Sequence, residues 1–300
     1  MGLSLSRYVN NNLLFLVIVF TVIGVLFPQF SFLTNYVSPI LFVMILGLGL
    51  TLTLQDFVKV AKTPQKILVA LIVQYSVIPV IAFTLTFLSN DPTIAIGILI
   101  IGCAPSEITS ALMVYLAGGN LALATAIMGS SILLAPFIMP LLLSLFAGEA
   151  VALDVGGMLI ELLLILALPI ILGSLLRTKL QKLKKYEEQF SSLSSIMVIL
   201  LIFTVASSSA EAILNASIIW LVVLLLTLNL SGYIIGFIVG KLIRSEGDFK
   251  TYMFTIGMKE FGVGAAVALQ FFGPEAALPS AVYGIIMLIT APILIKINKR

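Results

Sequence analysis

Ten apolar segments follow one another along this chain of 300 residues, and each is long enough to cross a lipid bilayer. A transmembrane helix needs about 20 mostly apolar residues. Hydrophobic residues make up 61% of the sequence and charged residues 10%, a composition far more apolar than that of a soluble domain. We therefore expect an all-α membrane protein with ten transmembrane helices. The predicted spans lie near 12–28, 36–54, 66–88, 93–117, 120–146, 156–176, 190–209, 215–241, 249–271 and 277–297.

The distribution of basic residues agrees with this count of spans. If the N-terminus lies in the cytoplasm, then both termini and the even-numbered links hold fifteen of the 16 basic residues, and the odd-numbered links hold none. Cytoplasmic loops carry an excess of Lys and Arg. We expect a multi-pass protein of the plasma (cell inner) membrane with both termini in the cytoplasm. The fifteen residues are Arg7, Lys59, Lys62, Lys66, Arg177, Lys179, Lys182, Lys184, Lys185, Lys241, Arg244, Lys250, Lys296, Lys299 and Arg300.

The link between the fifth and sixth predicted spans separates five spans from five. An odd number of spans in each half turns the second half upside down relative to the first, as in many secondary transporters. Gly257 follows Gly102 by 155 positions, and Asn229 follows Gln74 by the same offset. Such matches also arise by chance in so apolar a chain. The predicted inverted five-helix repeats are residues 1–147 and 148–300.

Two of the predicted spans contain helix breakers at mid-membrane depth. In the fourth, Pro105 removes a backbone donor and clashes with the preceding turn. In the ninth, Gly257, Gly262 and Gly264 surround Lys259, the only lysine outside the predicted cytoplasmic links. Each charge at a helix centre costs about 2.5–3.5 kcal/mol on insertion scales. We therefore expect these broken helices to meet at a functional site. The candidate substrate-binding or coupling residues are Lys259, Glu260, Glu107, Ser106, Thr109, Ser110, Gln74, Asn229 and Thr255.

Charged groups at this depth must pair or face a water-filled cavity, and two interpretations stay open. The N-terminal end of a half-helix offers free N–H donors and a positive dipole end, which favours an anionic ligand. Alternatively, Lys259 and Glu107 form an ion pair that only stabilises the helix bundle. We expect Glu161 at the membrane interface and Cys103 to be a small packing residue.

Missing residue types exclude several classes of function. The sequence has no histidine and one cysteine, so it offers neither a histidine base nor an intrachain disulfide. It contains no HExxH motif, no nucleophile beside a recognisable base and no cluster of metal ligands. We expect neither an enzyme nor a cofactor, no metal site and no nucleic-acid partner. A sensor is disfavoured because the chain leaves no room for a soluble signalling domain.

Four sequence runs carry a family resemblance: LTLTLQDFVKVAKTPQKILVALIVQ, GCAPSEITSALMVYLAGGNLALATAIM, LPIILGSLLR and GMKEFGVGAAVAL. Together they make nearly the whole chain similar to the bile acid:sodium symporter family, as a prokaryotic-type homologue. The resemblance implies ten spans, an inverted repeat and a crossing of the broken fourth and ninth spans. It implies a panel domain of spans one, two, six and seven that moves against a core of spans three to five and eight to ten. The family's substrates are mostly organic anions, usually taken up with two sodium ions.

The ligands that the resemblance implies for the first sodium ion are mostly lost. Ser110 matches the family's serine. Ala111, Ala124 and Met128 replace oxygen-bearing ligands, and Thr255 replaces a glutamate. Since sodium prefers several oxygen ligands, we predict that this site is absent.

The second ion site is changed by one residue. Gln74 matches the family's glutamine, and the backbone carbonyl groups of Ile256 and Met258 match in position. Lys259 stands where the family has another glutamine. We predict that the Lys259 ammonium group occupies the place of the ion and donates to the Gln74 amide oxygen and to nearby carbonyl groups.

These observations lead to a functional hypothesis with alternatives. A lysine in a low-dielectric site can lose its proton reversibly, and Glu107 or Glu260 would be its proton partner. We expect a secondary transporter of a small organic anion that works by alternating access, with a proton rather than sodium as the candidate coupling ion. The alternatives are a sodium-coupled organic anion or bile acid symporter and a cation/proton antiporter, although no adjacent acidic pair stands within a span. Arsenite efflux has slight support from Cys103.

Overall fold

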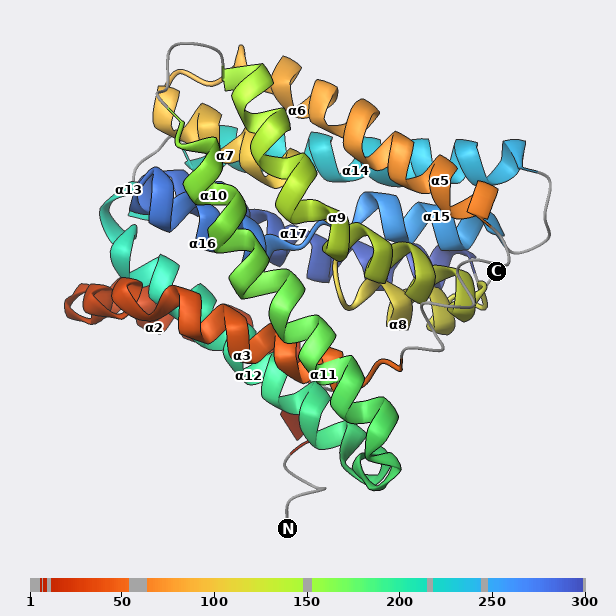
Figure 1. Ribbon diagram of the computed structural model, residues 1–300. Helices are drawn as coiled ribbons and strands as arrows, with labels where there is room; N and C mark the ends of the chain where they lie inside the picture. The colour runs from red at the N-terminus through yellow and green to blue at the C-terminus, as the bar shows by residue number, and fades with distance from the viewer. Residues whose placement is uncertain are drawn as a thin grey trace.

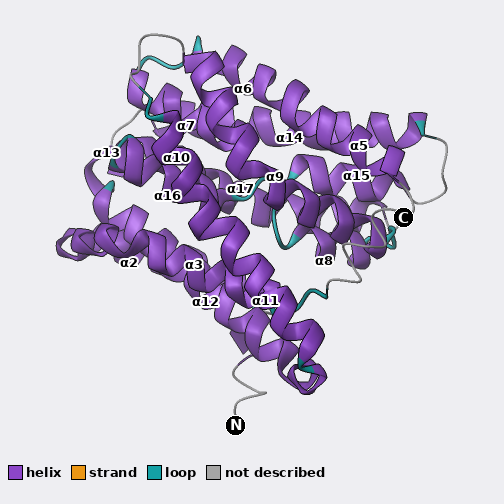
Figure 2. Cartoon of the chain, in the orientation of Figure 1, coloured by secondary structure: helices purple, strands orange, loops and turns teal. Residues whose placement is uncertain are grey.

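The computed structural model describes residues 6, 8–9, 12–53, 64–147, 153–214, 218–243 and 248–298. Within these ranges the chain is helical and contains no named strand, and one isolated antiparallel bridge is its β-type contact. The predicted all-α fold is therefore confirmed. Figure 2 shows how little of the described chain lies outside helices.

The helix bounds follow the predicted apolar segments. The α-helices are α2 (Leu13–Leu26), α3 (Val37–Gly49), α5 (Pro64–Ile72), α6 (Ile78–Thr86), α7 (Pro92–Cys103), α8 (Ser110–Leu116), α9 (Leu121–Ala147), α10 (Val155–Leu162), α11 (Leu168–Lys179), α12 (Glu187–Ser208), α13 (Ala210–Leu214), α14 (Ile218–Leu242), α15 (Asp248–Gly257), α16 (Phe261–Phe271) and α17 (Pro274–Asn298). The 3-10 helices are η1 (Pro28–Tyr36) and η5 (Gln181–Tyr186). Two π-helical turns, η2 (Val73–Val77) and η4 (Leu163–Ala167), join α5 to α6 and α10 to α11.

The length and surface of these helices suit a membrane. In the described part of the chain, seven helical stretches are long and apolar enough to cross a bilayer, and α2, α7 and α16 are shorter apolar helices. Large apolar side chains lie exposed on the outside, such as Leu141 on α9 and Ile219 and Trp220 on α14. An extensive exposed apolar surface marks a contact with lipid or protein. The chain is an integral multi-pass membrane protein.

Part of the predicted charge pattern lies outside the described residues. Arg177, at the end of α11, is described; it is largely buried and lies 3.7 Å from Glu187 at the start of α12. The predicted cytoplasmic residues that lie outside are Arg7, Lys59, Lys62, Arg244, Lys299 and Arg300.

The helices form two groups that meet near the middle of the molecule. In Figure 1, α2, α3, α11 and α12 lie together in the lower part, with α5 to α9 and α14 to α17 above them. α12 packs against α2 and α3, whereas α7 packs against α6 and α17. α16 contacts both α17 above and α3 below, so the break before α16 lies close to the boundary between the groups.

Glycines of α14 set the position of α15. A Cβ atom at Gly232 would lie 2.8 Å from the Cα of Gly257, and one at Gly236 would meet the carbonyl oxygen of Tyr252. Small residues let membrane helices approach closely. The C-terminal end of α15, which carries part of the site, is thereby held against α14.

Candidate functional site

Two helix breaks face each other inside the bundle. The fourth span is interrupted between α7 and α8, and the ninth between α15 and α16. A residue before proline favours extended backbone, and Ala104, before Pro105, has φ −62° and ψ 153°. The chain is therefore non-helical over 104–109 and again over 258–260.

These two linking segments run antiparallel and pair in one short bridge. Ser106 lies opposite Lys259, and the N–H groups of Glu107 and Glu260 donate the flanking backbone hydrogen bonds, at 3.0 and 2.9 Å. Successive side chains of an extended segment point to opposite faces. Ser106 and Lys259 therefore project from one face, which we call the lysine face. Glu107 and Glu260 project from the other, the carboxyl face.

Two prolines free the carbonyl groups that Lys259 contacts. Its Nζ donates to the carbonyl oxygens of Ala104 at 3.1 Å and Gln74 at 3.3 Å, and the whole residue is buried. Ala104 leaves its helix directly before Pro105. Gln74 lies in the π-turn η2. In a π-turn, the carbonyl of one residue accepts from the N–H of the residue five positions later. For Gln74 that residue is Pro79, which has no N–H. Both oxygens are thus left without helical donors and accept from the lysine.

The side chain of Gln74 does not bind Lys259, so that part of the prediction was wrong. Its Oε1 lies 2.7 Å from the Ser106 hydroxyl, and its amide nitrogen donates to Oγ of Ser131. The same Oγ accepts from the backbone N–H of Ser106 at 2.9 Å. The amide therefore holds the bridge in place, whereas the backbone carbonyl holds the lysine.

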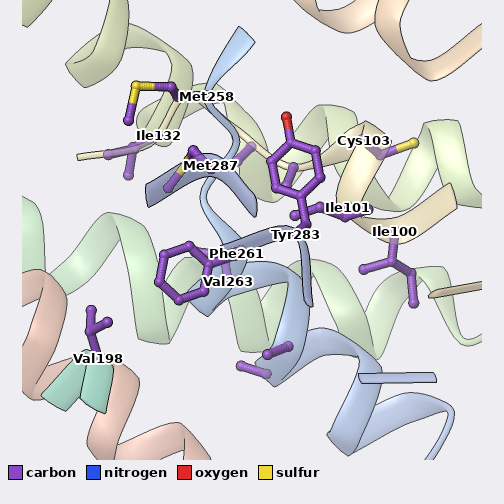
Figure 3. Packing of buried hydrophobic residues seen from close by; sticks show 14 of the residues in the cluster. Ile100, Ile101, Cys103, Ile132, Val198, Met258, Phe261, Val263, Tyr283 and Met287 are labelled. Atoms are coloured by element: carbon purple, nitrogen blue, oxygen red, sulfur yellow. The ribbon is translucent and has the colours of Figure 1, made fainter. Parts of the chain in front are cut away.

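The C-terminal end of α15 is closed by side chains of other segments. The last four carbonyl groups of a helix have no partner within it. Asn229 and Tyr283 both donate to the carbonyl oxygen of Gly257, at 3.0 and 2.7 Å. The hydroxyl of Ser106 lies 2.6 Å from the carbonyl oxygen of Thr255. Figure 3 shows Tyr283 among the buried apolar side chains that surround this region.

The carboxyl face brings two glutamates together. Glu107 and Glu260 are diagonal neighbours across the bridge, a spacing that long side chains can span, and their carboxyl groups interact with each other. Their exposed fractions are 2% and 0%. Oε2 of Glu260 accepts from the N–H of Ile108 at 3.2 Å. Oε1 of Glu107 accepts from the N–H and the hydroxyl of Thr109, each at 3.4 Å.

These contacts correct two expectations. The N–H groups before α8 already donate to the protein's own carboxyl groups, so they are not free for an anionic ligand. An ion pair between Lys259 and Glu107 is wrong as well, because the two side chains project from opposite faces. Among the described residues, no carboxylate lies within 4.0 Å of the Lys259 ammonium group. Neither glutamate is therefore a direct proton partner of the lysine.

The predicted breakers act differently from one another. Pro105 and Gly257 lie at the breaks, but α16 runs through Gly262 and Gly264, so those two do not break the helix. A Cβ atom at Gly264 would lie 2.6 Å from Oγ of Ser280. Gly262 and Gly264 serve close packing instead of interruption.

A cavity borders the carboxyl face. Glu107 and Thr109 line it from the bridge, and Ser191 and Ser194 line it from the first turns of α12. Leu13, at the start of α2, is also part of the wall. The cavity therefore lies toward the end of the molecule that carries the basic link between α11 and α12.

The implied sodium positions do not form an oxygen-rich site. Ala124 and Met128 are buried apolar residues, and the hydroxyl of Thr255 donates to the carbonyl of Thr251 in its own helix. Ser110 is buried and its hydroxyl has no hydrogen-bond partner. At the second position the carbonyl oxygen of Met258 accepts from the N–H of Glu107, and Lys259 contacts the carbonyl oxygens of Ala104 and Gln74.

Sequence reasoning missed three residues that build the site. Ser131 on α9 contacts both Gln74 and Ser106, Tyr283 on α17 closes the end of α15, and Pro79 frees the carbonyl of Gln74. A polar or breaking residue inside an apolar span was the available signal in each case. Among the described residues no group of three His, Cys, Asp or Glu side chains is placed to hold a metal ion.

The two remaining candidates, Cys103 and Glu161, make none of the hydrogen bonds of the bridge. Cys103 is buried at the end of α7 with a free thiol. Glu161 on α10 accepts a hydrogen bond from the hydroxyl of Ser38 at 2.8 Å.

Comparison with known proteins identifies the family. The family model "Sodium Bile acid symporter family" matches residues 38–216. The "Uncharacterized sodium-dependent transporter YocS" of Bacillus subtilis (strain 168) is 33% identical over 286 residues, which cover 94% of this chain and 89% of that protein. The "Probable sodium/metabolite cotransporter BASS1, chloroplastic" of Arabidopsis thaliana is 30% identical over 289 residues, which cover 93% of this chain and 71% of that protein. The chain belongs to the sodium/bile acid symporter family. It is a membrane transporter and not an enzyme.

Proposed function

We propose that this transporter works by alternating access and is built from two inverted five-helix repeats, residues 1–147 and 148–300. Each half supplies one broken span to the bridge. Gln74 contacts Ser106 at the first break, and Asn229 contacts Gly257 at the second. Gln74 and Asn229, which the sequence offset relates, therefore each contact the break of their own half. The seven long helical stretches, α2 and the two broken spans make ten crossings in this proposal.

The same proposal assigns the two helix groups to a panel and a core. The panel consists of α2, α3, α10–α11 and α12, and the core consists of α5–α9 and α14–α17. The broken spans belong to the core, while the cavity is walled by α2, α3 and α12 of the panel. Movement of one group against the other would therefore change access to the bridge.

The coupling part of the proposal is that Lys259 replaces a sodium ion. One observation carries it: the buried Nζ of Lys259, a residue that stands where the family has a glutamine, contacts two backbone carbonyl oxygens beside the helix breaks. A side-chain ammonium group is a fixed charge that cannot leave with the cargo. Transport would then proceed without sodium at this position.

We propose a small organic anion as the cargo. The support is the family itself and the word "metabolite" in the name of the BASS1 relative. The cavity offers hydroxyl groups of Thr109, Ser191 and Ser194 to a polar substrate. Because the cavity lies at the end that carries the basic link, this conformation would face the cytoplasm.

Two observations favour other coupling modes. The name of YocS states sodium dependence for that relative, which favours a sodium-coupled symporter. The proximity of Glu107 and Glu260 favours a cation/proton antiporter, because the fold supplies from two spans the acidic pair that no single span contains.

Uptake by reconstituted protein tests the proposal. A thermal-shift screen of short mono- and dicarboxylates and taurocholate, at several pH values, would first select an acid that stabilises the protein. Uptake of that acid into proteoliposomes is then measured with sodium and with sodium replaced by choline. We expect wild-type uptake to be equal in both, and Lys259→Gln, which restores the family's amide, to become sodium-dependent.

Lys250→Gln is the matched control. Lys250 also donates to a backbone carbonyl, that of Ala117 at 2.7 Å, but lies away from the bridge. It should leave the response to sodium unchanged. Sodium-dependent uptake by the wild type that survives Lys259→Gln unaltered would show that Lys259 does not replace the ion.

A further inference from the structure

We propose that Glu107 and Glu260 form a carboxyl pair that binds one exchangeable proton at the edge of the cavity. In this assignment the pair, and not Lys259, is the proton site of the transporter. The inference rests on the proposed transport function only for its consequence, which is coupling of a proton to the cycle. The proton site itself follows from the geometry of the carboxyl face.

Each of the two carboxyl groups has one hydrogen-bonded oxygen and one oxygen without a hydrogen-bond partner. In each group one oxygen accepts from a backbone N–H, of Thr109 or of Ile108. The other oxygens, Oε2 of Glu107 and Oε1 of Glu260, are buried and have no hydrogen-bond partner. An unpartnered buried polar atom is costly, so this pattern marks a place where a donor is missing.

A proton is the donor that fits between them. Two ionised carboxylates can only accept, and like charges held this close cannot both ionise at low cost. One proton converts one group into a donor and removes one of the two charges. It also allows a hydrogen bond between the two interacting carboxyl groups, which are diagonal neighbours across the bridge.

Among the described residues, no positive charge is placed to remove the need for that proton. Lys259 is adjacent in sequence but projects from the lysine face, where carbonyl groups hold its ammonium group. From α17, the hydroxyl of Tyr283 donates to the carbonyl of Gly257. The described residues of α3 and α12 that wall the cavity bring only apolar and hydroxyl side chains.

The carboxyl pair lies beside the cavity and between the two helix groups that are proposed to move. Glu107 lines the cavity, so a proton can exchange there with water. Glu260 lies behind it, near Gly262, where a Cβ atom would touch both Oε1 of Glu260 and the side chain of Met44 on α3. The proton site therefore lies where the two helix groups meet.

The charge balance shows how binding would couple to transport. With the Lys259 ammonium group, one carboxylate and one protonated carboxyl group, the bridge has no net charge. Release of the proton to cavity water leaves a net negative charge at mid-membrane depth, where charge is costly. The protonated bridge would thus be the form that moves between the two sides, with the proton taken from water on one side and returned on the other.

Infrared difference spectroscopy tests the site without any transported ligand. The purified full chain in liposomes is titrated with acid and base, and the C=O stretch of protonated carboxyl groups is recorded. We expect one buried carboxyl signal per chain in the wild type, set apart from the signals of the solvent-exposed Asp and Glu side chains by its C=O frequency. Glu107→Gln and Glu260→Gln should each lose it, because the remaining glutamate then faces an amide donor and stays ionised. Glu161→Gln, which removes a carboxyl group bound to Ser38, should keep it.

The outcomes separate this inference from the proposed function. A signal that survives in either Gln variant, or no titrating signal in the wild type, would overturn the shared proton. If a Gln variant does not fold, Glu107→Asp and Glu260→Asp keep the carboxyl group, and the signal must shift in frequency in both; an unshifted signal would also overturn it. Because uptake is not measured, a failed uptake assay with the signal present would count against the proposed function alone.

Discussion

The two faces of the bridge differ in how completely their polar groups are bonded. On the lysine face, the ammonium group, the Gln74 amide and the Ser106 hydroxyl all have hydrogen-bond acceptors or donors from neighbouring segments. On the carboxyl face, each glutamate keeps one buried oxygen without a partner. The polar groups of the lysine face thus have hydrogen-bond partners, whereas the carboxyl face lacks a hydrogen-bond donor, which one proton would supply.

This difference separates two roles that the sequence combines in one short motif. Lys259 and Glu260 are adjacent, yet the extended backbone between the half-helices sends them to opposite sides. The Lys259 ammonium group then lies on one side, bonded to two backbone carbonyl groups. The proposed proton site lies on the other side, next to the cavity.

The largest effect is expected for Lys259→Met. The variant keeps side-chain length but leaves the carbonyl groups of Ala104 and Gln74 without a donor, at a cost of about 1–3 kcal/mol for each unsatisfied group. We expect lost uptake and a lower free energy of unfolding, measured by denaturation in detergent. Lys250→Met should cost clearly less, and equal losses in the two variants would contradict a special role for the lysine face.

Gly236→Ala should have the next largest effect, because it displaces α15 as a whole. The added Cβ atom would meet the backbone carbonyl of Tyr252, and overpacking of this kind costs about 1–3 kcal/mol. We expect reduced stability and reduced uptake together. Gly156→Ala is the matched control, since its Cβ atom would lie 3.6 Å from the Asp154 carboxyl group, an ordinary van der Waals distance. A neutral Gly236→Ala would show that α14 does not set the position of the bridge.

Ser131→Ala should weaken the lysine face alone. It removes the acceptor of the Ser106 N–H and of the Gln74 amide, at a cost of about 1–2 kcal/mol for a buried donor left unsatisfied. Thermal denaturation should show the loss, while the carboxyl signal of Glu107 and Glu260 in the infrared titration should persist. The partly exposed neighbour Ser130 provides the control variant, Ser130→Ala. Loss of the carboxyl signal in Ser131→Ala would mean that the two faces are not independent.

Tyr283→Phe is expected to have the smallest effect. The variant removes one of two donors to the carbonyl of Gly257, and Asn229 still satisfies that oxygen. A loss of about 0.5–1.5 kcal/mol is typical of one hydrogen bond. Comparison with Asn229→Ala by thermal denaturation checks this, because the double variant should cost more than the two single losses combined. Simple additivity would contradict the shared carbonyl.

The sequence by itself determined the all-α membrane class, the positions of both helix breaks and most of the polar residues that meet there. Apolar segment length and proline chemistry act locally, so Pro105 and the run around Gly257 could be interpreted without a fold. The family resemblance pointed to the same two segments. Gly262 and Gly264 were misassigned because a glycine that serves close packing looks in sequence like one that breaks a helix.

The direction in which each side chain points was decided only by the tertiary structure. Whether Lys259 meets Glu107, Gln74 or a backbone carbonyl depends on the antiparallel register of two segments about 150 residues apart, which residue spacing does not encode. The π-turn that aligns Gln74 with Pro79, and the arrival of Ser131 and Tyr283 from other helices, likewise depend on packing. For that reason the sequence could place the charges at one site, but only the fold divided them between two faces.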